Sequence, residues 1–143
     1  MSDQTKRRLK MWIRLLGVTR RAENHLRDHL RVNHATTLPR FDVMAALYRR
    51  RDAVTMSELS RMLLVSNGNA TAVVDRLESE GLVVRTPSQA DRRTVIVALT
   101  PAGFDAFEGL AESHEAEVGR LFAGLAEEDL DQLTEIFKRM GRG

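Results

Sequence analysis

Three consecutive charged residues, Asp91, Arg92 and Arg93, stand directly before an apolar run with the composition of a β-strand. Guanidinium groups bind phosphate or carboxylate oxygens through paired hydrogen bonds. A proline and a short polar stretch, residues 87–90, come just before them. The pattern therefore predicts a loop between two strands with two arginines at its tip. Asp91 can brace this loop by bonding to Arg93 while Arg92 projects, or it can stabilise the turn through its own backbone.

A second polar group lies on a predicted helix that begins after Ser66 and runs to about Glu80. Its apolar positions recur at i, i+3, i+4 and i+7 and are Ala70, Val73, Val74 and Leu77. The residues on the face left over are Ser66, Asn67, Gly68, Asn69, Thr71, Ala72 and Arg76. Asparagine can pair with adenine through two hydrogen bonds, and a helix N-terminus suits phosphate oxygens. We therefore expect this helix to enter a DNA major groove, with Arg76 at the phosphate backbone.

The elements that position these two groups follow from helical periodicity and capping signals. The expected order is a helix over 5–33, a helix starting at 36–39, a short helix after a Thr55–Glu58 capping box, the helix ending near Glu80, strands over 82–85 and 94–99, a helix opening at Thr100-Pro101, and a last helix from 127–129. A helix-turn-helix followed by a two-stranded hairpin is a winged helix. The expected fold class is thus mainly α with a small β-hairpin wing.

The charge of the chain is unevenly distributed along its 143 residues. Lysines and arginines exceed acids by 8 over residues 1–93, whereas acids exceed bases by 6 over residues 94–143. A basic segment joined to an acidic one favours binding of a polyanion by one face of the molecule. No apolar run is long enough to span a bilayer, so we expect a cytoplasmic protein without a membrane partner.

The composition also excludes several kinds of reactive site. The absence of cysteine excludes a disulfide framework, a thiolate nucleophile and a thiolate metal site. The sequence shows no nucleophile–base pair, carboxylate pair or phosphate-cradling glycine loop, so we expect no enzyme and no cofactor.

Two strongly apolar helical regions, residues 1–35 and 101–143, flank the central winged region of residues 36–100. One interpretation is that they interlock with the same helices of a second copy, forming one intertwined domain in a homodimer. The alternative is an intramolecular bundle that covers the core of a single chain.

The stretches VSNGNATAVVDRLESEGLVVR and DRRTVIVALTPAG, residues 65–85 and 91–103, resemble the MarR family of bacterial winged-helix regulators. With the flanking helices, the resemblance covers essentially the whole chain. It implies a homodimer that binds a palindromic operator on double-stranded DNA, usually as a repressor. By position it assigns DNA binding to Arg92 and Arg93, with Asp91 bracing the wing, and to the helix residues from Ser66 to Arg76.

The resemblance also implies a small phenolic or anionic effector, bound between the dimerisation helices and the winged region. The candidate residues for this site are Trp12, Arg14, His25, His29 and Tyr48. His25 and His29 have the i, i+4 spacing of a transition-metal site, but no third ligand is spaced to complete it, so we expect no bound metal.

Two further questions stay open at the level of sequence. Arg49–Arg51 can compensate a helix end or contact phosphate. A winged helix can also be a protein-interaction module without specific DNA binding. The polar, asparagine-rich helix face and the arginine loop argue against that module, since protein partners favour apolar patches.

Overall fold

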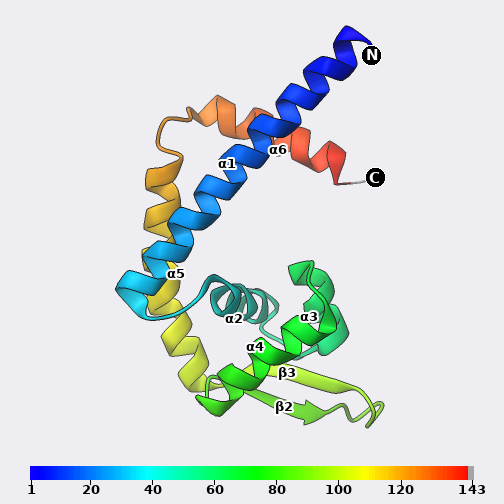
Figure 1. Ribbon diagram of the computed structural model, residues 1–143. Helices are drawn as coiled ribbons and strands as arrows, with labels where there is room; N and C mark the ends of the chain where they lie inside the picture. Colours follow the sequence, from blue (N-terminus) through cyan, green and yellow to red (C-terminus); the bar gives the residue numbers. More distant parts are fainter. Residues whose placement is uncertain (142–143) are drawn as a thin grey trace.

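The computed structural model describes residues 1–141, which form six helices and three strands. In chain order these are α1 (Asp3–His34), α2 (Leu38–Arg50), β1 (Val54–Thr55), α3 (Met56–Leu63), α4 (Asn67–Ser79), β2 (Val83–Pro87), β3 (Val95–Leu99), α5 (Pro101–Leu121) and α6 (Glu127–Met140). Figure 1 shows α1 and α5 side by side, rising from a compact module of α2, α3, α4 and the strands. The mainly helical fold with a small wing is as the sequence predicts.

Side-chain caps fix where the helices start, and they confirm the predicted boundaries. Five hydroxyl caps accept backbone N–H bonds three residues on: Ser2, Thr37, Thr55, Ser66 and Thr100, at 3.1, 3.3, 3.0, 3.2 and 3.0 Å. Thr55 and Glu58 form the reciprocal capping box. Gly81 follows α4 with a φ of +76°, a conformation that glycine adopts without steric cost.

The sheet has one strand more than the sequence analysis expects. Its order is β1-β3-β2, and all pairs are antiparallel. Val54 of β1 lies opposite Val97, and Val83 of β2 lies opposite Leu99. The hairpin itself is as predicted, but a strand of two residues has no periodicity by which the sequence could reveal it.

The core lies between α2, the sheet and the inner faces of α4 and α5. Its largest fully buried side chains are Leu30, Met44, Leu47, Leu59, Leu77, Val43, Val54, Val74 and Val97. Val73, predicted to lie in the core, is only partly buried. The first turn of α5 comes so close to the turn between α4 and β2 that a Cβ on Gly103 would lie 2.0 Å from the Leu82 carbonyl oxygen.

The helices at the two ends of the chain contribute little to this core. Leu30 is the buried residue of α1, and α6 buries none of its residues within the described chain. The apolar side chains of α1 and α6 face each other across a groove of about 570 Å³, which Met11, Leu15, Leu133, Ile136 and Phe137 help to line. The domain limits 1–35, 36–100 and 101–143 stay a prediction, and residues 142–143 lie outside the described part.

No helix within residues 1–141 is both long enough and apolar enough to cross a membrane.

Candidate nucleic-acid interface

The structure places the predicted reading face on the outside of α4. Its exposed members are Ser66, Asn67, Gly68, Asn69, Ala72 and Arg76. Thr71 is half-buried, and its hydroxyl donates to the Asn67 carbonyl oxygen at 2.8 Å. The Ser66 hydroxyl likewise accepts from the Asn69 amide nitrogen. Both hydroxyls therefore have partners within the helix, which leaves the Asn67 and Asn69 amide groups and the Arg76 guanidinium as the exposed polar groups of this face.

The C-terminal half of α4 is joined to β2 of the wing by a charged cluster. The Arg85 side chain on β2 donates to Glu78 at 2.9 Å and pairs with Asp75 at 2.5 Å, both on α4. The Arg85 backbone N–H also donates to Glu78, at 3.1 Å. These bonds from Arg85 lower the pKa of Glu78 below its usual value. The cluster sets the angle between α4 and the hairpin.

A second ion pair holds the C-terminal end of α4. Arg40 of α2 pairs with Glu80 at that end. No sequence pattern predicts a role for Arg40 or for Arg85. The sequence pattern that could have indicated the Arg85 cluster is two acids at i and i+3 on α4, followed by an arginine in the next strand.

The wing loop, residues 88–94, extends beyond β2 and β3 next to α4 (Figure 1). Arg92 and Arg93 are exposed in it. Asp91 Oδ1 accepts from the backbone N–H of Arg93 at 3.1 Å, and Oδ2 accepts from the Thr94 hydroxyl at 3.4 Å. Asp91 thus holds the turn through the backbone. Asp91 accepts a hydrogen bond from the backbone N–H of Arg93, so the Arg93 guanidinium takes no part in the turn.

The Arg49–Arg51 run makes contacts within the protein. Arg50 pairs with Glu58 at 3.2 Å, which joins α2 to α3. Arg51 lies 4.7 Å from the centre of the Tyr48 ring. These contacts favour a structural role for Arg50 and Arg51 over a phosphate contact.

Four arginines meet at a pocket that the sequence analysis did not predict. Arg27 and Arg31 of α1, Arg40 of α2 and Arg76 of α4 help to line a cavity of about 580 Å³. No acidic residue is among its lining residues in the described chain. The pocket joins the C-terminal end of α1 to the predicted reading helix.

The five residues predicted for an effector site lie in different settings. Trp12 and Arg14 are exposed on the N-terminal half of α1. His25 and His29 contact α5, through Glu117 and Ser113. Tyr48 packs against Phe104 and Phe107 with ring centres 5.8 and 4.9 Å apart.

Within residues 1–141, no three histidine, aspartate or glutamate side chains are arranged to hold a metal ion. His25 and His29 instead share Glu117, at 2.5 and 3.6 Å.

Comparison with known proteins supports the same assignment of fold. The family model described as MarR family matches residues 34–94. The HTH-type transcriptional regulator MhqR of Bacillus subtilis is 30% identical over 137 residues, which cover 96% of this chain and 93% of MhqR.

Two solved structures have the same arrangement over nearly the full length. AbsC, a MarR family transcriptional regulator from Streptomyces coelicolor, superposes with a TM-score of 0.86 at 26% identity, covering 99% of this chain and 95% of AbsC. A mutant MarR from E. coli complexed with operator DNA gives a TM-score of 0.79 at 26% identity, covering 97% and 99%. Together with the helix-turn-helix, the arginine wing and the long flanking helices, these similarities show that the chain belongs to the MarR family of winged helix-turn-helix transcriptional regulators, which bind DNA.

Proposed function

We propose that the protein is a repressor that binds a palindromic operator as a homodimer and is released by a small anionic effector. Each copy would place α4 in a major groove and the wing arginines in an adjacent minor groove, which attracts cations where it is narrow. The observation that carries this proposal is the surface of α4. Its apolar side is packed on the core and its C-terminal half is joined to Arg85, so Asn67 and Asn69 face outward from a helix of fixed orientation. Such a protein acts where the DNA is, which in a bacterium is the cytoplasm.

The E. coli relative solved with operator DNA supports a DNA target, because its fold matches over nearly the whole chain. By position, residues 66–76 and 91–93 would make the contacts. Arg92, Arg93 and Arg76 would bind phosphates or the minor groove, and Asn67 and Asn69 would contact base edges.

The terminal helices support a homodimer. Exposed apolar side chains gather on α1 and α6, including Trp12, Ile13, Ile136, Phe137 and Met140 at 49, 66, 40, 47 and 61% exposure. Large exposed apolar patches are unusual on monomers and mark interfaces. The two helices also have opposite charge: α1 carries nine basic and three acidic residues, whereas α6 carries five acidic and two basic residues. A second copy of the chain would offer α1 and α6 both an apolar surface and a helix of opposite charge.

The arginine pocket supports an anionic effector. A ligand with a carboxylate would meet the guanidinium groups of Arg27, Arg31 and Arg76, beside Arg40, which is already paired with Glu80. Its apolar part would lie against Leu38, Pro39 and Val73. Because Arg76 also belongs to the reading face of α4, a bound anion would compete with DNA phosphate for this side chain. The predicted residues Trp12, Arg14, His25, His29 and Tyr48 remain an alternative set for the effector.

The test is selection of bound sequences from a pool of random duplexes, followed by anisotropy titration of the selected sequence. We expect a palindrome, and affinity for it at least about 1,000-fold above that for a scrambled duplex. Aromatic acids added to the complex should release it, and Arg31→Ala should abolish release without abolishing binding. A protein-interaction module would bind no duplex, or would bind all duplexes equally.

A further inference from the structure

The turn between α3 and α4 exposes a leucine almost completely. Leu64 is 92% exposed, and no other large apolar side chain within residues 1–141 is exposed to that extent. Val65, the next residue, is 42% exposed. Single exposed apolar residues are common on protein surfaces, but these two adjoin each other directly before Ser66, the N-cap of α4. We call Leu64 and Val65 the apolar edge.

Leu64 also has a backbone conformation that leucine rarely adopts. Its φ of 57° and ψ of 40° lie in the left-handed region, at the C-terminal cap of α3. Two backbone bonds hold this turn: the Leu64 N–H donates to the Arg61 carbonyl oxygen at 3.3 Å, and the Val65 N–H donates to that of Ser60 at 3.2 Å. Helices commonly end in this way with a glycine, which has no Cβ to clash in the left-handed region. The backbone at this position therefore favours glycine over leucine.

The hydrophobic core does not account for a leucine at this position. Leu59 and Ser60 are the buried residues of α3, and Met62 and Leu63 pack partly against the core. The side chain of Leu64 stays in solvent. Within a single chain it adds backbone strain and exposed apolar surface without burying anything in return.

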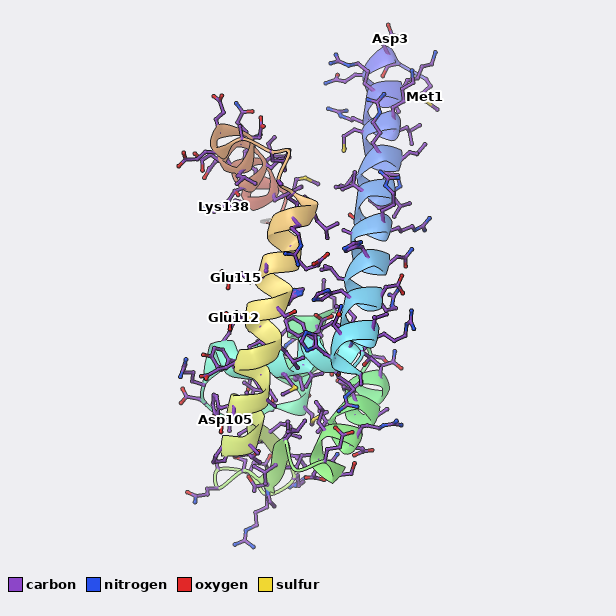
Figure 2. The ribbon with its side chains drawn as sticks, turned by 90° about the vertical axis from the view of Figure 1, so that its left-hand side faces the viewer. Met1, Asp3, Asp105, Glu112, Glu115 and Lys138 are labelled. Atoms are coloured by element: carbon purple, nitrogen blue, oxygen red, sulfur yellow. The ribbon has the colours of Figure 1, made fainter. Side chains whose placement is uncertain are left out.

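The proposed homodimer surface lies in another part of the molecule. Figure 2 shows Met1 of α1 and Lys138 of α6 at one end and the winged module at the other. The apolar groove between α1 and α6 is lined from Arg7 to Val18 on α1 and from Leu133 to Met140 on α6. A second copy that packs on these helices is placed away from the turn between α3 and α4.

The apolar edge adjoins the residues proposed to read DNA. Val65 and Asn69 help to line the same cavity of about 390 Å³, so the turn and the outer face of α4 lie side by side. Asn67 follows Leu64 by three residues. In helix-turn-helix proteins the N-terminal residues of the second helix meet base edges in the major groove. A side chain that projects from the turn before this helix is therefore placed at the same groove.

The chemistry of leucine restricts what it can recognise there. It has no side-chain atom that donates or accepts a hydrogen bond, so it can bind neither a phosphate oxygen nor the polar groups of a base edge. The major groove presents one apolar group at base edges, the 5-methyl group of thymine. Contact between this methyl group and a leucine removes apolar surface of both from water.

We propose that Leu64 is a specificity-determining residue that contacts a thymine 5-methyl group in each half-site of the operator. The inference rests on the proposed function, because it needs α4 in the major groove. Leu64 extends the reading surface beyond the amides of Asn67 and Asn69 and adds an apolar contact to their polar ones. The strained backbone persists because DNA, and not the core, receives the side chain.

The size of the effect follows from the burial of one methyl group. Loss of such a contact lowers affinity about fourfold for each half-site. Two independent half-sites multiply this to about 15-fold for the palindrome.

The test uses 2′-deoxyuridine, which pairs as thymidine does but lacks the 5-methyl group. Each thymine position of the selected palindrome is replaced in turn, symmetrically in both half-sites, and affinity is measured by anisotropy. For wild type we expect one position at which the replacement lowers affinity about 15-fold. Positions outside the reach of the apolar edge should bind as before.

Two variants of Leu64 separate the contact with thymine from a role in folding. Leu64→Gly should bind the thymidine and deoxyuridine duplexes equally well, and its midpoint of unfolding in urea should rise because glycine relieves the left-handed strain. Leu64→Met is the matched control. It keeps an apolar side chain on the same backbone and should keep most of the dependence on the methyl group.

Three results would overturn the role of Leu64 while the proposed function stands. They are a wild type that binds deoxyuridine duplexes as tightly as the palindrome at every position, a Leu64→Gly variant with the same methyl dependence as wild type, and a lower urea midpoint for Leu64→Gly. If the wild type selects no palindrome at all, the proposed function fails, and the contact with thymine fails with it.

Discussion

Asn69 and Arg92 are both exposed polar residues, but they belong to different parts of the interface. Asn69 lies on a helix whose orientation is fixed by packing and by the Arg85 cluster, so its backbone position is defined. Arg92 lies in a loop whose turn is held by Asp91. A residue that reads a base needs a packed helix to hold its backbone in place. A phosphate or minor-groove contact needs only a loop with an ordered turn.

Arg92→Ala should weaken binding to most duplexes, whatever their sequence, because it removes a charge that neutralises the backbone. The slope of log K against log salt should become about 0.9 less negative for each lost phosphate contact. Affinities measured over a series of salt concentrations test this. Arg20→Ala, which removes the same charge from the middle of α1, is the control and should leave the slope as it is.

Asn69→Ala should instead reduce discrimination at particular base pairs, by about 1–3 kcal/mol for a bidentate contact. The measurement is affinity for the selected duplex and for its single base-pair variants. If the substitution weakens specific and random duplexes equally, Asn69 is not a base reader.

At the scale of helices and strands, the sequence predicts those features that depend on residues close together in the chain. Apolar periodicity and the hydroxyl caps at Thr37, Thr55, Ser66 and Thr100 predict the helix starts to within a few residues. The strand composition of residues 82–85 and 94–99, with a polar linker between them, predicts the hairpin.

The remaining features depend on contacts between distant elements. β1 is a strand only because Val54 meets Val97. The Arg85 cluster, the arginine pocket and the contacts of His29 and His34 with Ser113 each need elements that dock in three dimensions. Even within one loop, the choice between two roles for Asp91 required the geometry, because both roles use the same residue types.

Gly103 gives a test at this scale. Its α-carbon lies against the Leu82 carbonyl, so Gly103→Ala should lower the free energy of unfolding by about 3 kcal/mol through overpacking against backbone. Gly109→Ala in the same helix is the matched control, because no atom lies within 4 Å of the added Cβ. There, better helix propensity should raise stability by about 1 kcal/mol. Urea unfolding compares the two, and equal effects would contradict the close approach of α5 to Leu82.

At the scale of the whole molecule, the winged module has a core of its own, whereas α6 exposes its apolar side. A monomer would leave this surface in water at considerable cost. The homodimer therefore accounts both for the terminal helices and for the pairing of two reading helices.

Phe137→Glu should convert the protein to a folded monomer, because it places a charge on the apolar side of α6. Sedimentation at micromolar concentration should give 16.1 kDa for the variant and twice that for wild type. Gln132→Glu, which adds the same charge at an exposed polar position of α6, is the control and should stay dimeric. A wild-type protein that sediments as a monomer would contradict the role given to the terminal helices.

The central claim is that two copies of the chain read one duplex through α4 and the wing. Its most direct test is an anisotropy titration of the selected palindrome, of the same duplex with one half-site scrambled, and of a fully scrambled duplex. Two chains should bind per palindrome, and scrambling one half-site should cost most of the specific affinity. Equal affinity for all three duplexes, or one chain per palindrome, would contradict the claim.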